Sequence, residues 1–143
     1  MQAAVIRSVR RGEAAMSYCM TKVLTDSPSV CEVKVRAALA EQGFGILTEI
    51  DVEATLRTKL GAEIGLYRIL GACNPAFAKG AIELEPRIGV MLPCNVILRG
   101  VAGGTEVSVV DPVASMVAID NPGLHSHAEA VRGKLQEAFD RIS

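Results

Sequence analysis

The chain has 143 residues, a length that suits one folded domain with its own core. Fifteen basic and sixteen acidic residues leave a net charge of −1, with no basic run beyond residue 11, which argues against nucleic acid as a partner. The longest uncharged stretch, residues 88–98, would span only about 17 Å as a helix, against about 30 Å of hydrocarbon in a bilayer. The composition therefore also argues against a membrane-spanning segment.

The interior is expected to be built from aliphatic side chains. Half of the residues are hydrophobic, but only 3% are aromatic and there is no Trp. The mean hydropathy is +0.31, which leaves more apolar surface than one small core needs. Such a surplus can be buried between subunits, so we expect a homo-oligomer.

The first fifteen residues differ from the rest of the chain. They contain Arg7, Arg10 and Arg11, but no apolar stretch of the length that a secretory signal needs. We therefore expect residues 1–15 to form a flexible N-terminal extension and residues 16–143 to form a single α+β domain.

The four cysteines form no CxxC or CxxxC pair, so neither a zinc knuckle nor a thioredoxin-type motif is present. Free thiols are typical of a reducing compartment, and the expected location is cytoplasmic.

The first half of the domain reads as strand, helix, strand and helix. Residues 16–24 mix β-branched and polar side chains as a strand does, and residues 25–28 supply helix caps followed by Pro. A helix should follow to residue 42, with Val30, Val33 and Ala37 on one side, and Ser29 with Glu32 offers an alternative capping box.

The next strand and helix are predicted from period and capping. Residues 44–50 alternate as a strand, and Asp51 can cap a helix over residues 52–60 that Gly61 ends. Val52, Leu56 and Leu60 recur at the helical period, which gives this helix an apolar stripe.

The second half begins with a third strand over residues 67–73, followed by a helix from Asn74-Pro75 that Pro86 stops. Residues 88–99 and 105–110 then read as a hairpin joined by a Gly-rich turn. Residues 113–119 fit either a strand or a helical turn.

The last predicted element is an amphipathic helix that ends at Ile142. Ser126 and Glu129 form a capping box before it, and Val131 and Leu135 begin its buried stripe. The whole order of elements indicates a sheet that helices cover mainly on one face.

Three blocks of sequence carry a resemblance to a known family. They are residues 43–51 (GFGILTEID), 68–75 (RILGACNP) and 92–96 (LPCNV). In order and spacing they resemble the domain of unknown function 302 family. The resemblance implies a compact two-layer α+β fold with a largely antiparallel sheet, and a homodimer, but no assigned reaction.

Cys73 is the first candidate site residue. It directly precedes the helix start at Asn74, where unpaired N–H groups and the helix dipole favour negative charge. That position favours a thiolate, which can act as a nucleophile or as a metal ligand. The alternative is a small buried residue at a strand end, because Cys is among the most buried residue types.

Cys94 precedes Asn95 as Cys73 precedes Asn74, and this repeated pair suggests a joint site. If the two strands are neighbours, both thiols could hold a soft metal, with a second subunit supplying two more sulfurs. Asn74 has a plain alternative as a helix cap. Asn95 lies in an apolar strand, where an unpaired amide would cost roughly 1–3 kcal/mol, so a polar pocket or a subunit contact should satisfy it.

Other polar groups give weaker signals. Glu49 and Asp51 would form an acid/base pair only if one strand ran through both, and Asp51 is better placed as a cap, although Glu49 could line a pocket. His125 and His127 are two residues apart, a spacing that does not bring side chains together on a helix and so indicates a metal site only weakly.

The leading hypothesis is a homodimeric small-ligand or soft-metal binding module that uses Cys73 and Cys94, with Asn74, Asn95 and Glu49 as further ligand contacts. A rival hypothesis is a thiol-dependent enzyme or redox protein in which Cys73 is the reactive thiolate. A third is an interaction or scaffold protein without chemistry. No nucleophile elbow, P-loop or dinucleotide fingerprint points to a particular reaction or cofactor.

Overall fold

The computed structural model describes residues 17–143, and the predicted extension over residues 1–15 lies outside that range. The predicted alternation of strands and helices is confirmed. In chain order the elements are β1 (Cys19–Leu24), α1 (Pro28–Glu41), β2 (Gly45–Asp51), α2 (Val52–Leu60), β3 (Tyr67–Cys73), α3 (Pro75–Leu84), the 3-10 helix η3 (Ile88–Met91), β4 (Cys94–Val101), β5 (Gly104–Val110), α4 (Pro112–Ser115) and α5 (Pro122–Asp140).

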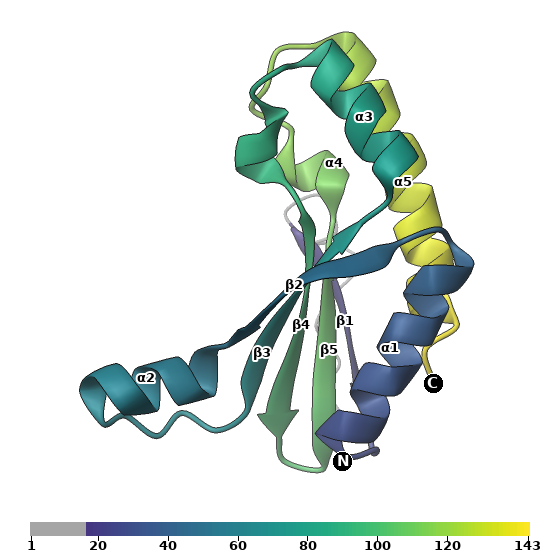
Figure 1. Cartoon of the computed structure of the whole chain (residues 1–143). Helices are drawn as coiled ribbons and strands as arrows, with labels where there is room; N and C mark the ends of the chain where they lie inside the picture. The colour runs from purple at the N-terminus through teal and green to yellow at the C-terminus, as the bar shows by residue number, and fades with distance from the viewer. Residues whose placement is uncertain (1–16) are drawn as a thin grey trace.

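The strands form one five-stranded sheet in the order β1-β5-β4-β3-β2, and every neighbouring pair is antiparallel. Helices α1 and α5 lie side by side on one face of this sheet (Figure 1). No helix of residues 17–143 packs on the other face, which we call the open face. The fold is therefore two-layer α+β with an antiparallel sheet, as the sequence and its family resemblance predicted.

The main core fills the space between the sheet and these two helices. Alternate residues of β3, β4 and β5 point toward the helices, because side chains of a strand alternate between its two faces. Leu70, Val96, Leu98, Val107 and Val109 are at most 1% exposed. They pack on Cys31, Val35 and Leu39 of α1 and on Val131, Leu135 and Ala138 of α5.

The buried side of α1 differs from the predicted one. Val30 and Val33 are 45% and 68% exposed, whereas Cys31 and Val35 are fully buried. Both sets recur at helical spacing, so the periodicity identified the helix correctly but did not identify its inner face. The N-cap is Ser27, whose side chain accepts a hydrogen bond from Val30 N, so the alternative capping box is not used.

Four helices begin with a capping residue followed directly by Pro. The caps are Ser27, Asn74, Asp111 and Asn121, and each accepts a hydrogen bond from a backbone N–H in the first turn. Pro suits the next position because its fixed φ matches a helix and its missing N–H would be unpaired there anyway.

The start of α5 was predicted wrongly. The predicted capping box at Ser126 lies inside the helix, because Asn121 already caps it through Leu124 N at 3.1 Å. The buried stripe of α5 is confirmed by Val131 and Leu135, which are 8% and 0% exposed, and Ile142 is buried just beyond the end of the helix at Asp140. None of the helices within residues 17–143 combines the length and the apolar content needed to span a bilayer.

Two segments after α3 also differ from the prediction. Residues 88–91 form η3 rather than the start of a strand, and β4 begins only at Cys94. In η3, Ile88 turns inward and packs with Ala81, Met116 and Leu124 in a second, smaller core. Residues 112–115 form the short helix α4, which settles the two alternatives for this region in favour of a helical turn.

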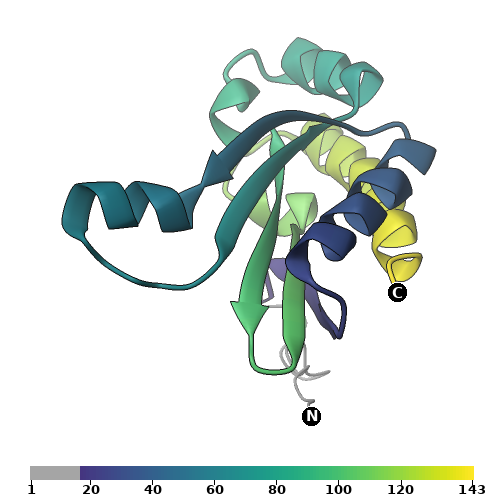
Figure 2. The ribbon, with the colours of Figure 1, turned by 60° about the horizontal axis from the view of Figure 1, so that its bottom comes forward.

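Helix α2 projects away from the rest of the protein beyond the end of β2 and β3 (Figures 1 and 2). Its predicted cap and terminator are confirmed: Asp51 accepts from Ala54 N at 2.9 Å, and Gly61 has the left-handed φ of 65°. However, none of its residues is buried, and Leu60 is 75% exposed. The apolar stripe of α2 therefore contributes nothing to either core.

Candidate functional site

A cavity of about 250 Å³ lies where the ends of β3 and β4 meet helices α3 and α5. Most of its wall is apolar: Phe77, Ala78 and Ala81 come from α3, Ala128 and Val131 come from α5, and Leu92, Pro93 and Met116 close it near η3 and α4. The polar groups on its wall belong to Cys73, Asn74, Cys94 and His127. This cavity brings together three of the predicted site residues, Cys73, Asn74 and Cys94.

Cys73 and Cys94 reach the cavity from neighbouring strands. Ala72 of β3 lies opposite Cys94 of β4, so Cys73 is one residue beyond that pair. Both residues line the same cavity, although they lie 21 positions apart in the sequence.

The Cys94 thiol is protonated at neutral pH. It is only 8% exposed, and burial raises its pKa from 9.0 to about 11, with a smaller contribution from the negative charge that Cys73 would carry. Burial acts in this direction because a thiolate loses its hydration in an apolar surrounding. Cys94 therefore presents a neutral, weakly polar surface to the cavity.

Asn74 is the N-cap of α3, as its plain alternative predicted. Its Oδ1 accepts from Phe77 N at 3.4 Å, and its Nδ2 donates to the carbonyl of Gln42 at 3.2 Å. Both ends of the amide are thus engaged by the backbone. Asn74 shapes the cavity mouth and ties α3 to the end of α1, but its polar atoms already have partners.

Asn95 does not share the cavity with Cys94. Consecutive residues of a strand point to opposite faces, so Asn95 lies on the open face, where it is exposed. Water can satisfy its amide there. Asn95 is therefore not among the residues that line the cavity beside Cys73 and Cys94.

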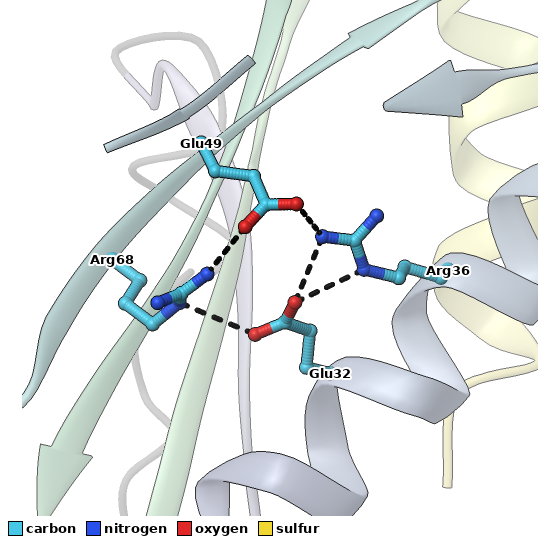
Figure 3. A network of polar contacts seen from close by, with 4 residues as sticks. All are labelled: Glu32, Arg36, Glu49 and Arg68. Atoms are coloured by element: carbon cyan, nitrogen blue, oxygen red, sulfur yellow. Dashed lines mark hydrogen bonds and ion pairs between the residues drawn. The ribbon is translucent and has the colours of Figure 1, made fainter. Parts of the chain in front are cut away.

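Glu49 is also outside the cavity and belongs to an ion-pair network (Figure 3). Its carboxylate accepts from Arg36 of α1 at 2.6 Å and from Arg68 of β3 at 2.8 Å. Glu32 of α1 completes the network: it accepts two hydrogen bonds from Arg36 and lies 3.2 Å from Arg68 Nε, which is not aligned for a hydrogen bond.

This network explains the properties of Glu49. The Arg36 guanidinium, by hydrogen bonding and by its charge, lowers the pKa of Glu49, and Arg68 adds to the effect. An ionised carboxylate held by two arginines is a poor proton acceptor, so Glu49 is unsuited to acid/base chemistry. Asp51 is the cap of α2, and the two do not act as a pair.

His127 is the polar cavity residue that was not among the predicted ligand contacts. Its Nε2 lies 2.7 Å from the Phe77 carbonyl, and because a carbonyl only accepts, Nε2 carries the proton. Its ring meets the Phe77 ring edge to face, and Gly80 makes room for it, since a Cβ there would lie 2.8 Å from the imidazole.

The signal for His127 was present in the sequence. It lies four residues before Val131, on the buried stripe of α5, and so faces the same side of the helix. His125 lies on a different side and bonds the carbonyl of Ile119. The two histidines therefore do not form a joint site.

The described residues hold no ready-made metal centre. Over residues 17–143, no three His, Cys, Asp or Glu side chains are grouped so that they could hold a metal ion. Within one chain, Cys73 and Cys94 would supply two sulfurs, and tetrahedral soft-metal sites use four ligands. A metal at this place would need ligands from a second subunit or from solvent.

Comparison with known proteins places the chain in a family. The family model described as "Domain of unknown function DUF302" matches residues 20–142. The chain belongs to the DUF302 family. A crystal structure of the uncharacterized conserved protein DUF302 from Bacillus stearothermophilus is similar, with a TM-score of 0.82 and 23% identity over 88% of this chain and 98% of that chain. No curated protein matches. At that identity, the structural similarity shows the shared DUF302 fold and nothing about function.

Proposed function

We propose that this DUF302 protein is a homodimeric binding module that holds a small, mainly apolar molecule in the cavity beside Cys73 and Cys94. The observation that carries the proposal is the cavity itself, because well-packed cores leave few spaces larger than a water molecule. A cavity lined mainly by carbon, with the neutral Cys94 thiol on its wall, favours apolar occupants over water, which needs two to four polar partners.

The size and chemistry of the cavity limit the occupant. About 250 Å³ is below the roughly 300–1,000 Å³ typical of sites for drug-sized ligands, which points to a molecule of one or two rings or a short chain. The neutral Cys94 thiol and the Nε2-protonated His127 offer weak polar contacts that could orient one polar group.

Indole is a suitable probe for this proposal. The chain contains no Trp, so the emission of indole can be followed without Trp emission from the protein. With nine non-hydrogen atoms, indole in a fitting cavity should bind with a dissociation constant of about 0.1–1 mM. The measurement is a fluorescence titration, with an NMR chemical-shift titration to locate the probe.

A matched pair of variants on α3 tests where indole binds. Ala78 lines the cavity and Ala76, on the same helix, is exposed. Ala78→Leu fills the cavity and should weaken indole at least about tenfold, whereas Ala76→Leu should leave the affinity unchanged. Equal affinity in both variants, or no binding to the wild type, would contradict the proposal.

Soft-metal binding at the same thiols is tested separately. Cd²⁺ bound to thiolates has a characteristic ultraviolet charge-transfer absorption, which Cys73→Ser and Cys94→Ser would each remove. The raised pKa of Cys94 weighs against this version, because a metal binds the thiolate and must first displace the proton. Cd²⁺ absorption at neutral pH that both variants abolish would favour the metal over the apolar ligand.

A second candidate function is thiol chemistry at Cys73. The observation that favours it is position: Cys73 is half-buried at the cavity and directly precedes the capped start of α3. Its test is the rate of alkylation by iodoacetamide in the folded state, read at each cysteine by mass spectrometry. If Cys73 reacts only after denaturation, both the enzyme and the redox hypotheses fail, and a scaffold role becomes the alternative.

A further inference from the structure

A second cavity, of about 240 Å³, lies where η3, the start of β4 and α4 come together. It shares part of its wall with the cavity of about 250 Å³ beside Cys73, which we now call the inner cavity; the second one is the outer cavity. Five residues line both spaces, and we call them the partition: Leu92, Pro93, Cys94, Pro112 and Met116. The two cavities are therefore direct neighbours.

The partition contains one side chain that can move while the backbone stays in place. Met116 directly follows α4, is 4% exposed, and packs in the smaller core with Ala81, Ile88 and Leu124. A methionine side chain is unbranched and has three rotatable bonds, so it adapts its shape more easily than Leu or Val. A change in the rotamer of Met116 can thus connect the two cavities without disturbing β4.

The outer cavity differs from the inner one in its polar groups. Asn95 and Ser115 lie on its wall. The Ser115 hydroxyl donates to the Pro112 carbonyl at 3.1 Å, and its oxygen can still accept a hydrogen bond. Asn95 is exposed, and its amide offers both a donor and an acceptor. The two side chains together suit a ligand group that both donates and accepts hydrogen bonds.

The surroundings favour a ligand group without charge. Among the residues of 17–143 that line the two cavities, none is Asp, Glu, Lys or Arg. Asp111, directly before the partition, is already engaged: it accepts from Val113 N at 2.9 Å and lies 3.4 Å from Arg132. A carboxylate or ammonium that left water for the outer cavity would find no opposite charge to replace its hydration. A neutral carboxamide loses much less hydration and keeps its donors and its acceptor.

The size of the two spaces also favours an elongated ligand. Each cavity alone is smaller than the roughly 300–1,000 Å³ of sites for drug-sized ligands, whereas the two joined fall within that range. A molecule whose ring fills the inner cavity needs only a short flexible chain past Met116 to bring a polar end to Asn95. Such a molecule would use the apolar wall and the polar wall at once.

We propose that the ligand of this protein is an elongated, uncharged amphiphile. Its apolar end occupies the inner cavity, and a carboxamide or a similar neutral group is held by Asn95 and Ser115 in the outer cavity. This inference rests on the proposed function, because it names the class of ligand for the same site. It also gives adjacent residues two roles: Cys94 belongs to the partition, and Asn95 binds the polar end.

Three probes with the same ring test the class of ligand. Indole fills the inner cavity alone, indole-3-propionamide adds a neutral polar end, and indole-3-propionate replaces the amide with a carboxylate of similar shape. The propionamide should bind at least about tenfold more tightly than indole, because it gains hydrogen bonds and buries its chain. The propionate should bind no more tightly than indole. Fluorescence titrations at pH 7 give the three dissociation constants.

Two variants and a matched control locate the polar end. Asn95→Ala and Ser115→Ala should each reduce the advantage of the propionamide over indole to about threefold or less, with indole itself unchanged. Arg99→Ala should keep the full advantage, because Arg99 is exposed on the same face of β4 but does not line the outer cavity. The ratio of two affinities is measured within each variant, so a general change in stability affects both values alike.

The outcomes separate this inference from the proposed function. If indole binds and the propionamide binds no more tightly, or if the propionate equals the propionamide, the ligand class is wrong and the proposed function stands. An advantage that persists in both Asn95→Ala and Ser115→Ala, or that Arg99→Ala also removes, overturns the outer cavity as the site of the polar end. If none of the three probes binds, the proposed function fails and this inference fails with it.

Discussion

The Lys22 ammonium of β1 lies 4.3 Å from the centroid of the Phe139 ring of α5 and donates a 2.7 Å hydrogen bond to the carbonyl of the same residue. It also donates to the carbonyl of Ile142 at 2.7 Å. The last carbonyls of a helix have no partner within it, and a cation there also opposes the negative end of the helix dipole. Lys22 of β1 thus caps the C-terminal end of α5.

Lys22→Met should destabilise the fold by about 1.5–3 kcal/mol, because it removes charged hydrogen bonds but keeps the apolar stem. Urea unfolding at pH 7 measures the change. Burial lowers the pKa of Lys22, partly offset by Asp140, so the ammonium is less well solvated than a surface lysine. Lys22→Arg retains charge and donors and is the control; an equal loss in both variants would show that the shape of the site matters more than the cation.

Asn74→Ala should cost about 1–2 kcal/mol of stability, because it removes the N-cap of α3 and the bond to the Gln42 carbonyl. Asn74→Asp keeps an oxygen that caps the helix but loses the N–H donor, so it should lose less. Thermal unfolding of the three proteins gives the order. If the Asp variant is as unstable as the Ala variant, the tie to Gln42 is the larger contribution.

Acid should weaken the ion-pair network around Glu49. The folded-state pKa of Glu49 is below its ordinary value of 4.5, so the stabilisation is complete above about pH 4.5 and is lost as the pH falls through the folded pKa. Glu49→Gln should therefore lower the melting temperature by a few degrees at pH 7 and by less at pH 3. High salt should shrink the difference at pH 7, since the group is half-exposed. A difference that is constant with pH would argue against ionic pairing.

A rise in pH should destabilise the protein through Cys94, whereas a fall in pH does so through Glu49. The folded pKa of Cys94 is raised from 9.0 to about 11, so the neutral thiol contributes fully below pH 9 and the contribution is lost as the pH rises toward 11. This rise in the pKa of Cys94 corresponds to about 2–3 kcal/mol of folding stability. Urea unfolding at a series of pH values measures it, and Cys94→Ala supplies the control: the part of the alkaline slope that it abolishes belongs to Cys94. Identical slopes in both proteins would contradict the raised pKa.

The local signals of the sequence predicted most of the fold. Helix starts at Ser27-Pro28 and Asn74-Pro75 and the end of α2 at Gly61 are set by local backbone chemistry, which a sequence displays directly. The start of α5 follows the same rule, because Asn121-Pro122 has the form of the two correct starts. The prediction instead used the capping box at Ser126, five residues after Asn121.

What could not be predicted depended on contacts between distant segments. The period of α1 fits either of two faces, and only the position of the sheet selects Cys31 and Val35 as the inner one. Asn95 and Cys94 are adjacent in sequence but separated by the sheet, because Cys94 pairs across from Ala72 and points to the helices. Glu49 is held by Arg36, whose position on α1 is set by packing.

The placement of β1 has a consequence for synthesis on the ribosome. Leu24 pairs with Thr105 and Cys19 with Val110, so β1 must wait for a partner strand that is made more than eighty residues later. At about 5–20 residues per second, that wait is roughly 4–17 s. During this interval β1 has no partner strand, so the five-stranded sheet cannot be completed until β5 has been made.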